Sequence, residues 1–359
     1  MIELKQIESK EELKQFYKVV GEIYKGNTYM RFTEDELIKM IVEKKSVFFK
    51  HAKIINYIIK KDSEIVGRFS LIKDDNMSDY VQVSFFECKL NINEIGKLII
   101  KEAKKLFPKC KKVVVGLNAH LNYSAGFLAS RFNEVPIFGL PYSQPYYAGY
   151  FEFLNKKTMY SYRFANQGFY DLLKKWNIDC DGVTIRTMDR KYFERDINIY
   201  TKLNNDCFTE HPFWSNRTKE EDLELLKQFS ILLEDEHLII AEKGGKPIGF
   251  LFWYPDFNQL TNYGLNITHL LKYKLTNKID TIRIAEIAVL PKYRHNGVTS
   301  MLIKEVAKFA NEKGYAHTEA GFIFEENKVS IITTLNSVEK ATGKKIEPYR
   351  KYVMFEGEL

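Results

Sequence analysis

The hydrophobic and polar positions of the chain alternate between the period of helices and the period of strands. Ser9–Glu12 has the form of a capping box, and an apolar stripe with helical spacing follows it. Runs of alternating or continuous apolar residues, bounded by polar turns, indicate strands. The first half predicts these elements in order: helices from Ser9 and from Thr33, strands at 54–59, 65–72 and 80–86, a helix at 92–107, and strands at 113–115 and 159–164.

The second half repeats this order of elements. It predicts a strand at 183–188, a helix at 192–204, a helix from the capping box at Thr218, strands at 237–242, 247–254 and 282–290, a further helix, a strand at 317–323, another helix and final strands that end near 355. Gly67 and Gly249 fall at equivalent points of the two halves, each inside an apolar strand. Repetition at the length of a domain indicates two copies of one fold.

One junction in the second half has the pattern of an anion site. The strand at 282–290 runs through a short basic loop, Arg294–Thr299, into an amphipathic helix that ends near Gly314. The first amides of a helix are unpaired and, with the helix dipole, favour a negative charge. Gly297 has no Cβ, so a phosphate could approach the backbone closely there. The alternative is a strand-to-helix turn that binds no phosphate.

The loop resembles the acyl-CoA-binding motif of the GNAT acetyltransferases, (Arg/Gln)-x-x-Gly-x-(Gly/Ala), although Thr299 departs from its last position. The resemblance implies acetyl-CoA or another acyl-CoA as cofactor. It implies that the pyrophosphate is held by the loop, that is by Arg294, His295, Asn296, Gly297, Val298 and Thr299. It also implies that backbone groups of the preceding strand hold the pantetheine arm and thioester, namely those of Ile287, Ala288 and Val289. For Arg294 and His295 the alternative is a pair of solvated loop side chains.

The layout of the whole chain resembles a group of bacterial tandem GNAT proteins. The resemblance rests on Gly139–Tyr142 and Pro145–Tyr147 in the first half, and on Tyr254–Asp256, the phosphate loop, Glu326–Asn327 and Tyr349–Tyr352 in the second. It implies an α/β (α+β) fold of two tandem GNAT-like domains, each a mixed, mostly antiparallel sheet flanked by helices. We expect a first domain at 1–164, a linker at 165–181 and an acyl-CoA-binding domain at 182–359. No Arg-x-x-Gly motif stands at the corresponding place in the first domain, so we expect no phosphate site there.

Acyl transfer to an amine needs a base, and Glu286 lies within the apolar run before the loop. A buried carboxylate is costly unless it is paired or functional, so Glu286 is the candidate base, directly or through a water. The alternative is a glutamate on the solvent side of its strand.

The resemblance further suggests that Asn327 and Ser330 contact the cofactor arm, with helix capping by Asn327 as the alternative. The tyrosine that the family places seven residues after this asparagine is replaced by Thr334, which leaves Tyr349 or Tyr352 of the C-terminal strands as the candidate acid.

The acceptor side is less defined. Phe213 and Trp214 lie between the first two helices of the second half, where the family contacts its acceptors, and are candidate substrate residues. Cys207 and His211 nearby could suggest a thiol nucleophile, but a third orienting partner is not identifiable, and a helix end followed by an aromatic loop explains them more simply. The aromatic stretch 136–147 either lines an acceptor groove or packs on the core as an ordered loop.

Composition narrows the class of protein. The chain has 359 residues, a formal net charge of +7 and four scattered cysteines without metal or redox spacing. The sequence shows no long apolar run and no signal peptide, so we expect a cytoplasmic protein that binds neither membrane nor nucleic acid and needs no metal. Its partner would be a small-molecule or peptide amine. The sequence does not decide between a monomer and a homodimer.

These patterns favour an N-acyltransferase that moves an acetyl or longer acyl group from CoA to an amine by direct attack. A non-catalytic acyl-CoA-binding or scaffold protein is the alternative, favoured by the missing tyrosine and the degenerate first half. A tandem transferase of the Fem or myristoyltransferase kind is a further alternative, although the CoA loop argues against a tRNA-borne donor.

Overall fold

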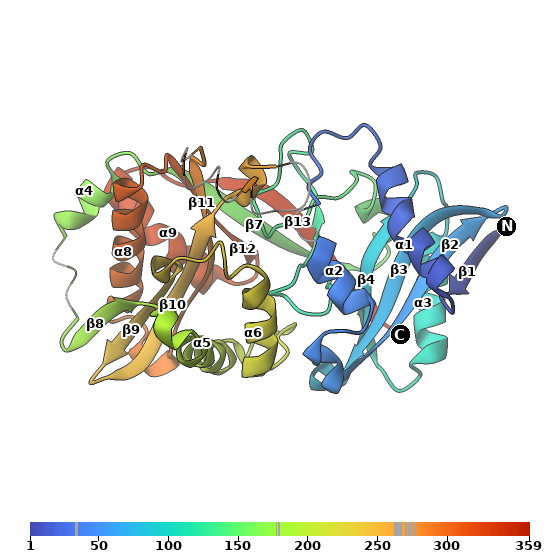
Figure 1. The fold of residues 1–359 in the computed structure, drawn as a ribbon, viewed down its shortest axis with the longest axis horizontal. Coiled ribbons are helices and arrows are strands. Elements are labelled where there is room, and N and C mark those ends of the chain that lie inside the picture. The colour runs from blue at the N-terminus through green and yellow to red at the C-terminus, as the bar shows by residue number, and fades with distance from the viewer. Residues whose placement is uncertain are drawn as a thin grey trace. The chain divides into compact units, whose positions relative to one another are not determined.

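The structure, a computed structural model, describes all residues except 33, 34, 177, 179, 262–267, 270, 272–274, 276 and 277. The predicted helix start at Thr33 therefore lies outside the described residues. The chain forms two compact units: the first contains Met1–Met159, Phe213–Ser215 and Lys351–Leu359, and the second contains Tyr160–Pro212 and Asn216–Arg350 (Figure 1). None of the described helices has both the length and the hydrophobicity needed to cross a bilayer.

The first unit is built on a mixed sheet with the order β1-β2-β3-β4-β5-β13, and β6 pairs with β13. Its strands are β1 (Ile2–Gln6), β2 (Ala52–Lys61), β3 (Glu64–Asp74), β4 (Tyr80–Cys88), β5 (Lys112–Val115), β6 (Phe127–Leu128) and the end of β13 (Pro348–Glu358). Its helices are α1 (Lys10–Ile23), α2 (Asp35–Val42) and α3 (Ile95–Leu106). Only β4 and β5 pair in parallel among these neighbours, over Tyr80–Val83.

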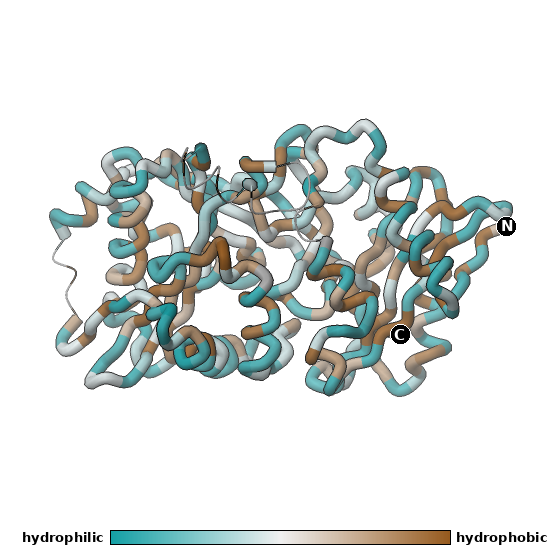
Figure 2. The backbone as a smooth tube through the Cα atoms, viewed as in Figure 1, coloured by the Kyte–Doolittle hydropathy of each residue, from teal (hydrophilic) through white to brown (hydrophobic). Residues whose placement is uncertain are grey.

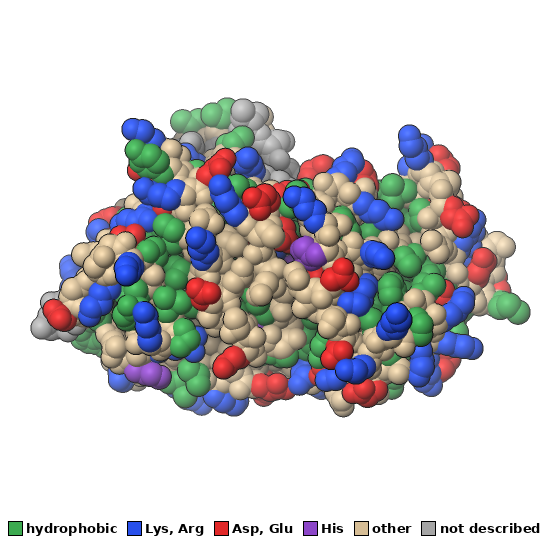
Figure 3. Space-filling view, turned by 90° about the horizontal axis from the view of Figure 1, so that it is seen from below, with side chains coloured by type: hydrophobic (Ala, Val, Ile, Leu, Met, Phe, Trp, Pro, Cys, Tyr) green, Lys and Arg blue, Asp and Glu red, His purple; other side chains and the backbone are tan. Residues whose placement is uncertain are grey.

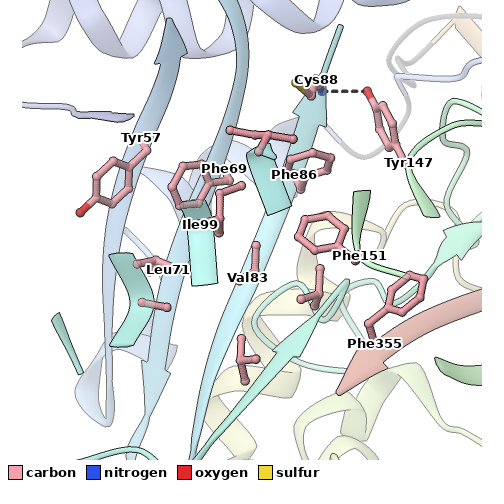
Figure 4. Packing of buried hydrophobic residues seen from close by; sticks show 14 of the residues in the cluster. Tyr57, Phe69, Leu71, Val83, Phe86, Cys88, Ile99, Tyr147, Phe151 and Phe355 are labelled. Atoms are coloured by element: carbon pink, nitrogen blue, oxygen red, sulfur yellow. Dashed lines mark hydrogen bonds between the residues drawn. The ribbon is translucent and has the colours of Figure 1, made fainter. Parts of the chain in front are cut away.

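The core of the first unit is rich in aromatic rings. Tyr57 and Phe69 stack at 4.7 Å between ring centroids, and Phe86 meets Phe151 edge to face at 5.0 Å (Figure 4). Such ring pairs add to the stabilisation that burial of the rings already provides. The aromatic stretch 136–147 is packed against the protein, because most of its large side chains are buried: Ile137, Phe138, Leu140, Tyr142 and Tyr147. It is a packed loop.

The second unit has the sheet order β7-β12-β11-β10-β9-β8. Its strands are β7 (Asn155–Ala165, from Tyr160 on), β8 (Val183–Thr187), β9 (Leu238–Lys243), β10 (Lys246–Pro255), β11 (Thr281–Val289) and β12 (His317–Phe324). Its helices are α4 (Phe169–Lys174), α5 (Phe193–Phe208), α6 (Lys219–Gln228), α8 (Val298–Glu312) and α9 (Lys328–Thr342). β11 and β12 pair in parallel, while β8 to β11 pair antiparallel.

The helices of the second unit cover both faces of its sheet. α5 packs on the face that carries Phe250 and Phe252, where Tyr200 meets both rings. Trp253, which alternates with Phe252 along β10, stacks on Phe309 of α8 instead. The hydrophobic stretches of the chain follow these strands and helix faces, whereas the turn between β9 and β10 is hydrophilic (Figure 2).

Local signals account for the ends of several helices. Ser9 accepts a hydrogen bond from the Glu12 amide and the Glu12 side chain accepts one from the Ser9 amide, which confirms the predicted capping box. Thr218 and Glu221 form the same reciprocal pair at the start of α6. Each box satisfies amide groups that a helix end otherwise leaves unpaired.

Two strands pass from one unit to the other. β7 begins in the first unit and continues in the second from Tyr160, and β13 leaves the second unit after Arg350 and ends in the first. Its last residues pair with β5, as Phe355 opposite Val115 shows. The boundary between the units therefore lies near residue 159, and the last nine residues of the chain belong to the first unit. The sequence suggested contiguous domains at 1–164 and 182–359, with a linker at 165–181.

Candidate active site

The parallel pairing of β11 with β12 ends partway along both strands. The last paired residues are Ile284 and Ala320. At the same place the register between β10 and β11 shifts, so that Ala285 is an extra residue between Ile284 and Glu286, that is, a β-bulge. Bulges redirect side chains and end strand pairing. After this bulge, the backbone of Ala285–Val289 is no longer paired with β12 in the parallel ladder. The strand segment whose backbone we expected to hold a thioester lies here.

A short loop joins this strand to α8. Pro291–Tyr293 forms one turn of 3₁₀ helix, His295 and Gly297 take positive φ values of 64° and 80°, and α8 begins at Val298. No side chain caps this helix start within the described part of the chain, and Gly297 itself occupies the N-cap position. Residues 294–297 are exposed. Free amides at an exposed helix start suit an anion such as a pyrophosphate.

Gly297 is constrained from two directions. Its positive φ favours glycine, and a Cβ placed there would lie 2.9 Å from Sγ of Cys180. That sulfur also lies 2.7 Å from the carbonyl oxygen of Asn296, so its S–H donates a hydrogen bond to the loop. The buried Cys180 thus supports the loop from the side opposite to solvent.

Arg294 anchors the loop. Its Nε donates to the carbonyl oxygen of Val289 at 3.0 Å, and its Nη2 donates to the carbonyl of Cys207 at 3.3 Å. Val289 ends β11 and Cys207 lies near the end of α5, so one guanidinium joins the loop to two elements. The positive charge of Arg294 precedes the start of α8 in the chain, but these two hydrogen bonds are donated to backbone carbonyl groups of the protein.

Glu286 projects from β11 toward α5. The hydroxyl of Tyr200 donates a hydrogen bond to its Oε1 at 2.7 Å. The residue keeps some exposed surface, but its Oε2 atom is shielded from solvent. Burial raises the pKa of the Glu286 carboxyl to about 7, against the lowering effect of the Tyr200 hydrogen bond. A carboxyl with a pKa near neutrality can both take up and release a proton at physiological pH.

A second polar layer lies behind Glu286. Arg217 and Asp222 form a fully buried ion pair with 2.6 Å between Nε and Oδ1, and Thr201 donates to the other Asp222 oxygen at 2.7 Å. The charge of Asp222 further raises the pKa of Glu286, and that of Arg217 lowers it. Tyr200 and Asn204, both on α5, are also buried and both lower the pKa of Glu286. Sequence reasoning missed these two residues, although polar side chains inside the apolar stripe of an amphipathic helix were a usable signal.

The predicted contacts of the cofactor arm lie at the start of α9. Asn327 is the N-cap residue of this helix, and its Oδ1 accepts from the Ser330 amide at 3.0 Å. The capping alternative therefore describes one role of Asn327, and its side-chain nitrogen is not used in that bond. Thr334, which replaces the tyrosine of the family pattern, is buried within α9.

Tyr349, the candidate acid, lies at the start of β13 among arginines. Its hydroxyl accepts a hydrogen bond from Nη1 of Arg163 at 3.1 Å, and the guanidinium groups of Arg163 and Arg350 lie 5.3 and 5.1 Å from its ring centre. These contacts define its surroundings but do not join it to Glu286.

Phe213 and Trp214 belong to the first unit, although the sequence placed them on the acceptor side of the second domain. Phe213 is 1% exposed and meets Tyr80 edge to face at 5.9 Å. Trp214 meets His120 at 4.8 Å, and Ser215 beside it donates to Asp74 at 2.5 Å. A phenylalanine as buried as Phe213 offers almost no surface to an acceptor in this structure.

The cysteine and histidine near this segment are held in their neutral forms. Burial raises the pKa of the Cys207 thiol to about 11, and burial lowers the pKa of His211 to about 4. A thiol with so high a pKa is a poor nucleophile at neutral pH, in line with the interpretation of this segment as a helix end with an aromatic loop. Within the described residues, no three His, Cys, Asp or Glu side chains are grouped to hold a metal ion.

The corresponding strand end of the first unit is occupied by the protein itself. Tyr147 accepts a hydrogen bond from the Cys88 amide at 3.1 Å (Figure 4). Its hydroxyl donates to Glu87 at 2.6 Å. Tyr146 donates to the Cys88 carbonyl and Tyr150 to the Lys89 carbonyl. The backbone groups after β4 are thus paired with tyrosine hydroxyls.

A family model described as the acetyltransferase (GNAT) family matches residues 198–332, which run from α5 through the phosphate loop into α9. Among curated protein sequences, none matches the chain significantly. The family match and the site geometry coincide in the second unit.

Solved structures share the arrangement of the whole chain. A tandem GNAT protein from the clavulanic acid biosynthesis pathway, in the form without AcCoA, covers 100% of this chain and 98% of its own, with 12% identity and a TM-score of 0.54. A glucosamine N-acetyltransferase region of a fungal β-N-acetylglucosaminidase covers 99% of this chain but 38% of its own, with 10% identity and a TM-score of 0.58. A probable N-acyltransferase from Enterococcus faecalis covers 99% and 72%, with 12% identity and a TM-score of 0.52. At these identities the likeness shows a shared two-domain fold.

Proposed function

We propose, on the premise that this chain belongs to the GNAT superfamily, that its second unit transfers an acetyl or longer acyl group from CoA to an amine. The observation that carries this proposal is Glu286, a carboxyl whose pKa is raised to about 7 at the point where β11 leaves β12, on the strand that leads to an open helix start. An acid–base group beside an anion site is what amine acylation by a CoA thioester requires.

The residues of the loop fit a pyrophosphate. Gly297 has no Cβ, so an anion can come close to the backbone there. The helix α8 begins without a side-chain cap, and residues 294–297 are exposed. Asn296, Val298 and Thr299 would offer further backbone amides, and Arg294 and His295 would add positive character at its edge. Asn327 and Ser330 would contact the pantetheine arm. When bound, the cofactor supplies the acyl group as a thioester.

The backbone of Ile287, Ala288 and Val289 would orient the thioester, since it lies beyond the end of the parallel ladder. Glu286 would take the proton of the amine as the nitrogen forms its bond to the acyl carbon and the carbon–sulfur bond breaks. The sulfur leaves with the bonding electrons and takes up a proton. Tyr349 is the candidate donor of that proton, and the Arg163 guanidinium at its hydroxyl would favour the phenolate that remains.

The second candidate is an acyl-CoA-binding protein without turnover. The observation that favours it is Thr334, which stands buried in α9 where the family pattern has a tyrosine. A tyrosine is not required if another group or solvent protonates the sulfur, so Thr334 favours this alternative only as long as no acylated product is found.

One set of measurements separates these candidates. The intact protein is titrated calorimetrically with acetyl-CoA and with a long-chain acyl-CoA, and is then assayed for thiol release with a panel of small-molecule and peptide amines. Binding with thiol release and an acylated product supports the transferase. Binding without any product on the panel supports the binding protein, and no binding to either ligand rules out both.

A further inference from the structure

Two polar side chains of α5 lie one helical turn apart and point toward β11. Tyr200 is 2% exposed and Asn204 is 0% exposed. Residues four positions apart share one face of a helix, so both reach the same stretch of strand. Tyr200 donates to Oε1 of Glu286 at 2.7 Å, and this bond fixes one carboxyl oxygen. The second oxygen, Oε2, is left to other partners.

Three buried polar atoms meet at this point. Oε2 of Glu286 and both amide atoms of Asn204, Oδ1 and Nδ2, are shielded from solvent and have no hydrogen-bond partner within standard distance in the described part of the chain. The Asn204 side chain nevertheless lies close enough to lower the pKa of Glu286. Each buried polar atom left unpaired costs about 1–3 kcal/mol, so a small adjustment that pairs them is favoured.

An amide is suited to this carboxyl in both of its protonation states. The carboxylate oxygen needs a donor, which Nδ2 provides, whereas the protonated oxygen needs an acceptor, which Oδ1 provides. Rotation of the amide by half a turn exchanges the two atoms at nearly the same place. Neither atom is engaged elsewhere in the described chain, so the exchange breaks no other hydrogen bond.

We propose that Asn204 is the positioning residue for the proton-carrying oxygen of Glu286, donating to it when it is ionised and accepting from it when it is protonated. This rests on the proposed function of Glu286 as the base. Asn204 does not touch the acyl group or the amine in this scheme. It keeps Oε2 oriented while the proton arrives and leaves.

Asp222 and Arg217, the charged neighbours that shift the pKa of Glu286, are paired with each other. Asp222 on α6 is bound by Arg217 and by Thr201, at 2.6 and 2.7 Å. Tyr200 on α5 is bound to the other carboxyl oxygen of Glu286. Asn204 is therefore the side chain on α5 that can change its hydrogen bond when the charge at Oε2 changes.

The test measures the protonation of Glu286 without a substrate. Infrared difference spectra of the intact protein are recorded through a pH titration, and the band of the protonated carboxyl is assigned by its loss in Glu286→Gln. Asn204→Leu, which keeps the approximate volume but removes both polar atoms, is expected to move the midpoint upward by about one pH unit, because the ionised form loses its donor. Asn311→Leu, at an exposed position of α8, serves as the control and is expected to leave the midpoint unchanged.

A second variant guards against a folding defect. Asn204→Ser keeps a group that can donate and accept, so its midpoint is expected to lie between those of the parent and of Asn204→Leu. Equal midpoints in the parent and in either folded Asn204 variant would overturn the proposal. If an amine substrate is found, the acid limb of kcat/KM should move with the infrared midpoint. A protein without turnover would refute the transferase, whereas the infrared midpoints would still decide the role of Asn204.

Discussion

Gly67 and Gly249 lie at the same register position in the two units, each pressed against a carbonyl oxygen of the neighbouring strand. A Cβ at Gly67 would lie 2.5 Å from the Glu87 oxygen, and one at Gly249 would lie 2.8 Å from the Ala288 oxygen. The end of β4 and the end of β11 are therefore counterparts. The segment after β11 leads to Gly297, whereas the segment after β4 is bound by tyrosine hydroxyls. This difference predicts one acyl-CoA site in each chain.

Gly297→Glu is expected to remove that site. The side chain would require a Cβ 2.9 Å from the Cys180 sulfur at a φ of +80°, and it would add a negative charge where an anion binds. We expect acyl-CoA affinity to fall by more than about tenfold in calorimetry, a loss of over ~1.4 kcal/mol.

The matched control for this variant is Gly314→Glu. Gly314 also has a positive φ, +73°, but a Cβ there meets nothing within 4 Å, and it lies past the far end of α8. It should bind acyl-CoA like the parent, with one ligand for each chain. Unchanged affinity in Gly297→Glu, or two ligands for each parent chain, would show that the loop is not the site.

Much of the element order was predictable because its signals are local. The capping boxes at Ser9 and Thr218 and the hairpin turn between β9 and β10 are specified by neighbouring residues. The placement of β13 in the first unit was not, since strand patterns do not encode which sheet edge a strand joins. Buried Arg217 and Asp222 form an ion pair, whereas Figure 3 shows surface charges of both signs mixed on the displayed face.

The residues of the candidate site also fall into two groups, those that the local sequence marks and those whose roles depend on packing. Gly297 and Glu286 could be found from the sequence because a motif and an unusual local context mark them. Tyr200 and Asn204 could be noticed as polar side chains inside the apolar stripe of α5, but their roles could not be inferred, because these depend on the packing of α5 against a strand more than 80 residues away. Phe213 was proposed as a substrate residue from its place between two helices, and its burial against Tyr80 in the first unit depends on contacts that no local pattern encodes.

Glu286→Gln tests the base. The parent should show a kcat/KM that rises with pH through about 7, where Glu286 ionises, for whichever amine is accepted. The variant lacks the base, so we expect kcat to fall by about 10²- to 10⁴-fold and the limb near pH 7 to disappear. Acyl-CoA affinity should change little, because the loop amides are untouched. An identical pH profile in variant and parent would exclude Glu286 as the base.

The same variant should reveal how much the ionisation of Glu286 lowers the free energy of unfolding. The pKa of Glu286 is raised in the folded state from its ordinary 4.5 to about 7, so the folded protein holds the proton more tightly than the unfolded chain. The resulting stability is present below about pH 4.5 and is lost as pH rises through about 7. Glu286→Gln does not titrate, and its free energy of unfolding relative to the parent should rise by about 2 kcal/mol between pH 5 and pH 8.5. Thermal unfolding at both pH values measures this, and a pH-independent difference would contradict the buried carboxyl.

Tyr147→Phe tests the closure of the first unit. Tyr147 is 0% exposed, donates to Glu87 at 2.6 Å and accepts from the Cys88 amide at 3.1 Å. Burial raises the pKa of Glu87, and the hydrogen bonds from Tyr147 and Tyr24 oppose that rise. Loss of the hydroxyl leaves a buried amide unpaired and should lower the free energy of unfolding by about 1–3 kcal/mol.

Tyr192→Phe, at a tyrosine that is 47% exposed, is the control and should leave the free energy of unfolding nearly unchanged. Denaturant titration followed by circular dichroism measures both variants. The acyl-CoA affinity of Tyr147→Phe should equal that of the parent, because the proposed site lies in the second unit. A variant as stable as the parent would mean that the hydroxyl of Tyr147 does not stabilise the strand end. A variant that binds a second acyl-CoA per chain would contradict the prediction of one site in each chain.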